Sequence, residues 1–127
     1  CNTGPEPILF GKDPCHSCKM IISDRSFGAE VVTKKGKVYK FDDSRCLLSF
    51  LKSNQVPMVQ IGNVYLVDYA QKEKLVSVET VFLLKGEKIR GPMAGDIAAF
   101  ESEADKKQFQ AEWKAQSITW KDIIGNQ

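Results

Sequence analysis

The chain has 127 residues, of which 43% are hydrophobic and 27% are charged, and its formal net charge is +2. This size and composition favour one folded domain over a disordered chain. No stretch approaches the about 20 consecutive apolar residues that a membrane-spanning helix needs, so the sequence predicts no such helix.

The first nine residues predict a tether rather than a part of the domain. They begin with Cys1 and continue through a short segment that contains glycine and proline. A cysteine in this position is typical of a bacterial lipoprotein whose signal peptide has been removed, and lipid on its sulfur would hold the chain at a membrane. We therefore expect residues 1–9 to be a lipoprotein-type tether attached through Cys1, and residues 10–127 to be the domain. The expected location is the periplasm or the cell surface; the alternative is an arbitrary start of the chain.

The first half of the domain predicts a hairpin, a helix and further strands. Residues 27–41 place apolar side chains around a Lys-Gly turn, which is typical of a β-hairpin. Residues 42–54 combine an Asp-Ser start, apolar residues at helical spacing and a Lys-Ser-Asn end, which predicts a helix. Residues 57–69 alternate like strands around a Gly-Asn pair, so we expect two strands and a turn there.

The second half repeats this order of elements. Residues 75–92 predict another strand pair, and residues 96–102 predict a further strand. An amphipathic pattern over residues 101–116 predicts a helix, and a short amphipathic segment, 117–124, follows it. The sequence therefore predicts a single small α+β domain with antiparallel strands and two main helices, and the repeated order suggests two related ββαβ-like halves.

Four lysines cluster at the turn of the first expected hairpin. They are Lys34, Lys35, Lys37 and Lys40. No aromatic stacking platform accompanies them, so a solvated hairpin tip is favoured over a nucleic-acid patch, and we expect no nucleic-acid partner.

The segment GKDPCHSCKM, residues 11–20, concentrates the reactive side chains of the chain, with His16 between Cys15 and Cys18. A thiol–disulfide oxidoreductase would carry such a cysteine pair at the start of a helix, but the residues after Cys18 lack a helical pattern. A structural zinc site needs four ligands, and only Cys46 and His16 remain to complete it. A c-type haem site would have histidine directly after the second cysteine, where this chain has lysine.

Monovalent copper fits this segment better. Cu(I) prefers thiolates and thioethers and accepts low coordination numbers. Met20 lies two positions after Cys18, so an extended backbone would place both side chains on one face. Met93 lies on a loop flanked by glycine and proline, where a ligand role is favoured over packing. The candidate ligands are therefore Cys15, Cys18, Met20 and Met93.

Several of these sulfur and nitrogen groups have a simpler interpretation. Met20 precedes two isoleucines, so packing in the core is an equal alternative for it. Met58 and Cys46 lie in an expected strand and an expected helix, and we expect both to be buried hydrophobic side chains. His16 is either an exposed residue without a role or a nitrogen ligand.

The order and spacing of three motifs resemble the NosL family of nitrous oxide reductase accessory lipoproteins. The motifs are DPCHSCKMIISDRSFGAEV, KVYKFDD and GPMAGDIAAFESEADKKQF, and together they span about residues 11–113. The resemblance implies a small α+β fold similar to part of organomercurial lyase, in a membrane-anchored Cu(I)-binding protein. It associates the protein with copper delivery to the enzyme that reduces nitrous oxide. Family members commonly have glycine where this chain has Lys19.

By position, the resemblance implies the metal ligands Cys15, Cys18, Met20 and Met93, and lipid attachment at Cys1. We expect a protein that is not an enzyme and that passes Cu(I) by ligand exchange to a copper enzyme such as nitrous oxide reductase, or to its maturation machinery. The alternatives are a thiol–disulfide oxidoreductase and a structural domain in which Cys15 and Cys18 form an inert disulfide.

Overall fold

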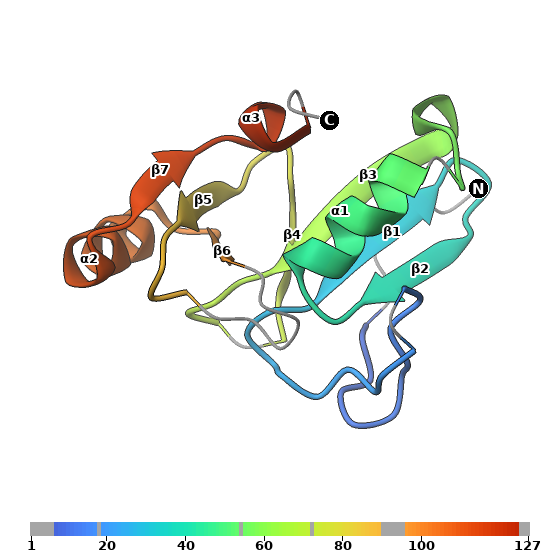
Figure 1. The fold of residues 1–127 in the computed structure, drawn as a ribbon, viewed down its shortest axis with the longest axis horizontal. Coiled ribbons are helices and arrows are strands. Elements are labelled where there is room, and N and C mark those ends of the chain that lie inside the picture. The colour runs from blue at the N-terminus through green and yellow to red at the C-terminus, as the bar shows by residue number, and fades with distance from the viewer. Residues whose placement is uncertain (1–6, 18, 54, 72, 90–95, 125–127) are drawn as a thin grey trace.

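Two antiparallel β-sheets and the helices packed on them form the protein (Figure 1). The computed structural model describes residues 7–17, 19–53, 55–71, 73–89 and 96–124. The first sheet has the strand order β2-β1-β3-β4, and the second has the order β6-β5-β7.

The first sheet and helix α1 are built from consecutive segments. A Lys-Gly turn joins the first two strands, and a 3-10 helix, η1, leads into the third. The bounds are β1 (Ala29–Thr33), β2 (Val38–Phe41), α1 (Ser44–Ser53), η1 (Met58–Gln60), β3 (Ile61–Val67) and β4 (Leu75–Ser77).

The second sheet follows in the chain and packs against α2, whereas α3 packs against the core cluster of the first sheet and α1. Its strands are shorter than β3, and α2 lies between the second and third of them. The bounds are β5 (Phe82–Lys85), β6 (Ile97–Phe100), α2 (Glu103–Trp113), β7 (Gln116–Ile118) and α3 (Trp120–Ile124). None of the helices within the described residues is long and apolar enough to cross a membrane.

Both halves follow one topology. In each, the first strand lies in the middle and pairs antiparallel with the second strand and with the strand after the helix. This gives β2-β1-β3 in one half and β6-β5-β7 in the other. The predicted α+β class is confirmed, and the ββαβ arrangement suggested by the repeated order occurs twice.

Two predictions about the middle of the chain are wrong in detail. Residues 61–67 form one strand that runs through the Gly-Asn pair, with no turn there. A Cβ atom at Gly62 would lie 3.1 Å from the carbonyl oxygen of Val32, where the β1–β3 register shifts. The glycine therefore allows β1 and β3 to approach closely at this irregularity, and it does not form a turn. The strands expected within residues 75–92 both exist, but β4 pairs with β3 and β5 with β6 and β7.

Helix α1 is packed more deeply than helix α2. It begins after Asp43, whose Oδ1 accepts the amides of Arg45 and Cys46 at 2.9 and 3.2 Å, and such caps satisfy amides that a helix start leaves unpaired. Its buried side chains are those of Ser44, Cys46, Leu47, Phe50 and Leu51. The prediction that Cys46 is buried is confirmed, whereas the side chain of Met58 lies outside the described part of the chain.

A polar joint connects the two sheets. Asp68 follows β3 and forms an isolated parallel bridge with Ala99 of β6, and the amide of Tyr69 donates to the carbonyl of Ala99 at 2.8 Å. The buried Asp68 carboxylate accepts bonds from the Gln71 side chain at 2.7 Å and the Glu101 amide at 3.2 Å. Because buried carboxylates are stable only when hydrogen-bonded, this joint holds the halves in one arrangement.

Candidate metal centre

The cysteine loop, residues 13–22, is a narrow antiparallel hairpin. The amide of Ile22 donates to the carbonyl of Asp13 at 2.8 Å, and the amide of Cys15 donates to the carbonyl of Met20 at 2.7 Å. Cys15 and Met20 therefore face each other across the hairpin, and His16, Ser17 and Lys19 are described between them.

The tip turns back through a left-handed residue. Lys19 has a φ of 67°, and its amide donates to the carbonyl of Cys15 at 2.9 Å. Glycine adopts this conformation without the steric cost that a Cβ atom introduces. The Cβ atom of Lys19 therefore introduces this steric cost at the tip of the loop.

Hydrogen bonds fix the cysteine loop to the first sheet and to α1. The amide of His16 donates to the carbonyl of Lys40 in β2 at 2.8 Å, and the Ser17 hydroxyl donates to the carbonyl of Cys46 in α1 at 3.0 Å. The Lys40 ammonium is paired with the Asp13 carboxylate at 2.8 Å. This hydrogen bond, with that from the Leu9 amide, lowers the pKa of Asp13.

The His16 ring is part of these attachments. Its Nε2 atom is hydrogen-bonded to Gln55 Oε1 at 3.1 Å. The ring centroid lies 4.8 Å from that of Tyr39 and 5.2 Å from that of Phe50, in edge-on geometry. His16 is half-buried rather than fully exposed, and its use as a metal ligand stays a prediction.

The candidate ligands differ sharply in exposure. Cys15 is completely buried within the hydrophobic core, whereas the side chain of Met20 is 60% exposed. The packing alternative for Met20 is therefore wrong, and its thioether is accessible to solvent. The predictions for Cys18, Met93 and Cys1 concern positions outside the described residues.

The described ends of the two candidate ligand segments approach the same turn of α1. Ser17 contacts Cys46 from the cysteine loop. Asp96, which follows the segment 90–95, lines a hollow of about 380 Å³ together with Ser44 and Arg45. The first turn of α1 thus lies beside both segments.

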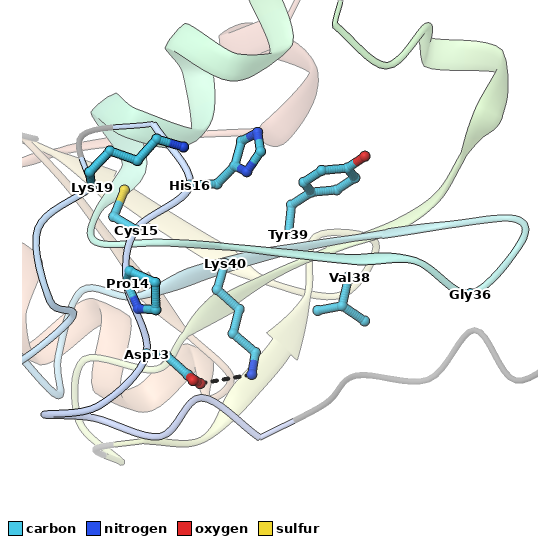
Figure 2. Close-up of a pocket in the computed structure, with 9 residues that line it drawn as sticks. All are labelled: Asp13, Pro14, Cys15, His16, Lys19, Gly36, Val38, Tyr39 and Lys40. Atoms are coloured by element: carbon cyan, nitrogen blue, oxygen red, sulfur yellow. Dashed lines mark hydrogen bonds and ion pairs between the residues drawn. The ribbon is translucent and has the colours of Figure 1, made fainter.

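A shallow pocket of about 390 Å³ opens between the cysteine loop and β2 (Figure 2). Figure 2 shows the side chains of Lys19, His16 and Tyr39 on one side of the β2 backbone, and the Asp13–Lys40 pair on the other. Cys15 contributes to the floor of the same pocket. The pocket therefore joins the candidate metal loop to the lysine-rich hairpin.

The attachments of the loop could not be found from the sequence. Asp13 and Lys40 lie 27 positions apart, and Ser17 and Cys46 lie 29 apart, so no local pattern relates them. Both pairings depend on the packing of β2 and α1 beside the loop.

The setting of the cysteines differs from that of a disulfide oxidoreductase. The described residues on both sides of Cys18 form a hairpin rather than the start of a helix, and the sheet pairings are antiparallel, whereas the oxidoreductase motif belongs to a βαβ unit. Within the described residues, no group of three or more His, Cys, Asp or Glu side chains could hold a metal ion.

The fold and the loop define a small α+β domain that presents a sulfur-bearing loop at its surface. The NosL family model matches residues 9–127, and the chain belongs to the NosL family. Among solved structures, the fold is similar to that of the copper chaperone NosL from Shewanella denitrificans, with a TM-score of 0.78 and 22% sequence identity over 94% of this chain and 95% of that chain. No curated protein sequence matches the chain. The family is one of non-enzymes, as the sequence predicted.

Proposed function

We propose that this protein is a copper chaperone that binds one Cu(I) and delivers it by ligand exchange. Its proposed ligands are Cys15, Cys18, Met20 and Met93. Membership in the NosL family and the fold shared with a copper chaperone support this function. Thiolate and thioether sulfur suits Cu(I), which is soft and accepts few ligands.

The observation that carries the proposal is the exposed thioether of Met20 on a loop with a fixed backbone. A thioether carries no proton, so it binds Cu(I) over a wide pH range, and a partner can reach it from solvent. Cys15 has no exposed surface. Exchange with a partner therefore begins at the exposed sulfur of Met20, and Cys15 is the last ligand to be replaced.

The position of α1 supports a contribution from the second loop. Ser17 and Asp96 lie beside the first turn of this helix, and Met93 is three residues from Asp96 in the sequence. A short segment of chain could thus bring the Met93 thioether to the cysteine loop. The ion would then be held between the two halves of the protein.

The proposal includes an extracytoplasmic location and attachment to a membrane through lipid on Cys1. It also names a copper enzyme such as nitrous oxide reductase, or its maturation machinery, as the recipient. The resemblance of the motifs to the NosL family supports both parts of the proposal. Mass spectrometry of the protein from its native membrane tests the lipid directly.

Anaerobic Cu(I) titration against a chromophoric chelator tests the ligand set. Met20→Leu, Met93→Leu and Cys18→Ser should each lower the Cu(I) affinity by about tenfold or more, because each removes a soft donor. Met58→Leu removes the remaining thioether of the chain and is the matched control; it should leave the affinity unchanged. Unchanged affinity in both Cys18→Ser and Met93→Leu would contradict the ligand assignment.

A further inference from the structure

The lysines at the tip of the β1–β2 hairpin border the pocket that the cysteine loop lines. Lys34, Lys35 and Lys37 are exposed, and Gly36 between them lines the same pocket as Lys19 of the cysteine loop. Within the described part of the chain, none of these lysines forms an ion pair. Their charges add to a positive field that is not neutralised locally.

Exposed apolar side chains lie on the cysteine loop and just before it. The exposed large hydrophobic residues of the described chain are Leu9, Met20, Ile21 and Val59, and the first three lie on the cysteine loop or just before it. The amide of Leu9 donates to Asp13 Oδ2 at 2.9 Å, which fixes this residue to the base of the loop. An apolar centre with a charged rim is the usual composition of a protein interface.

We propose that this surface, the basic docking face, receives a carboxylate-rich protein segment of the partner that takes the copper. Its charged residues are Lys19, Lys34, Lys35 and Lys37, and its exposed apolar residues are Met20 and Ile21. Opposite charges steer two proteins together and fix their orientation, so the partner would arrive with its own ligands directed at Met20. The proposal rests on the proposed copper-delivery function.

The surface suits an acidic protein better than a nucleic acid. The Lys37 ammonium lies 5.1 Å from the centre of the Tyr39 ring, and the His16 ring meets the same ring edge-on. The aromatic face that nucleic-acid bases would need for stacking is therefore already occupied. The pocket of about 390 Å³ between the loop and β2 offers room for a projecting acidic side chain next to Lys19.

Peptide binding to the full chain, with and without Cu(I), tests the docking face. The probe is a ten-residue polyglutamate peptide, with a ten-residue polyglutamine peptide as the neutral comparison. We expect polyglutamate to shift the NMR signals of Lys19, His16 and Tyr39, and its binding to weaken with added salt. The triple variant Lys34→Glu/Lys35→Glu/Lys37→Glu should lose about tenfold in affinity for polyglutamate.

A matched variant separates local recognition from overall charge. Lys85→Glu/Lys88→Glu/Lys121→Glu makes the same charge change at exposed positions of the second half and should retain polyglutamate binding. Equal loss in both variants, or binding only to vesicles that contain phosphatidylglycerol, would overturn the proposal. The Cu(I) affinity of both variants should equal that of the parent. If the parent fails to bind Cu(I), the proposed function fails, whereas absent peptide binding in a Cu(I)-binding protein overturns the docking face alone.

Discussion

The two halves of the molecule share a topology but differ in how their helices are packed and in what they support. Helix α1 has five buried side chains, whereas α2 has none, and packs through the half-buried rings of Phe109 and Trp113. The cysteine loop is hydrogen-bonded to α1 and β2, in the first half. The same arrangement of strands and helix thus has a deeply packed helix that supports the cysteine loop in the first half, and a more exposed helix in the second half.

At one matching position, the two halves shift the pKa of an acidic side chain in opposite directions. A buried phenylalanine ends β2 and another ends β6, and each is followed by an acid, Asp42 or Glu101. Burial, followed by the charges of Asp43 and Asp24, raises the pKa of Asp42 to about 6. The pKa of Glu101 is lowered instead, because its exposed carboxylate accepts hydrogen bonds from Lys74 and Gln71.

The largest expected effect compares the two helices directly. Phe50→Ala should lower the free energy of unfolding by about 3–5 kcal/mol, because it leaves a cavity in a packed core. Phe109→Ala should cost about half as much, because Phe109 is only partly buried. Urea unfolding at one pH measures both variants. Equal losses would show that α2 is as important to stability as α1.

The next effect tests the joint between the halves. Asp68→Ala should lower the free energy of unfolding by about 2–4 kcal/mol, because it removes a buried acceptor of several hydrogen bonds. Trp113 packs in the second core cluster, whereas Trp120 packs against the first. The Trp113 fluorescence of a Trp120→Phe background can therefore be compared with far-UV circular dichroism during urea unfolding. If Asp68 couples the two halves in the parent, the Asp68→Ala variant should show two separate transitions, one for each probe. A single transition at the midpoint of the parent would contradict that role.

A smaller effect is expected at Asp42, where a substitution should raise the free energy of unfolding rather than lower it. One of its oxygens is buried without a hydrogen-bond partner among the described residues. The unfolded carboxyl titrates near 3.8, so the folded state binds the proton more tightly. Ionisation then lowers stability as the pH rises from about 4 to 6, by roughly 2–3 kcal/mol in total.

Asp42→Asn should remove this dependence. We expect the variant to be more stable than the parent at pH 8 and similar to it near pH 4, as measured by urea unfolding across that range. Glu101→Gln, at the matching place in the second half, should instead be slightly less stable than the parent at neutral pH. A parent-like pH dependence in Asp42→Asn would contradict the assignment.

The smallest effect concerns two lysines with left-handed backbones. Lys19 lies at the tip of the cysteine loop, and Lys114 ends α2, with φ values of 67° and 53°. Replacing either with glycine should raise the free energy of unfolding by about 0.5–1 kcal/mol, because glycine avoids the steric cost at positive φ. Thermal unfolding measures the difference, and destabilisation by Lys19→Gly would indicate that its side chain contributes more than its backbone costs.

The sequence predicted those parts of the fold that local patterns determine. The Lys-Gly hairpin, the two main helices and the Asp-Ser start of the first helix all appear, because turn residues and caps act within a few positions. It failed at Gly62, where the need for glycine comes from β1 across the sheet. It also failed to show that β4 and β5 belong to different sheets, since strand partners depend on distant segments.

The sequence predicted the chemical type of the candidate ligands, but not their positions or their burial. The soft-donor composition of residues 15–20 identified the loop. The contrast between Cys15 and Met20 was not visible, because burial depends on α1 and β2 packing beneath the hairpin. Likewise, the sequence favoured a solvated role for all four clustered lysines, whereas Lys40 is paired with Asp13.

The bond from the His16 amide to the Lys40 carbonyl has a consequence for self-association. β2 is the outermost strand of its sheet, and this carbonyl points away from β1. Outer strands with open backbone groups are templates for intermolecular pairing and fibril growth. The loop that carries the cysteines therefore also shields this border from neighbouring molecules, and chemical damage that detached it would be expected to promote precipitation of the protein.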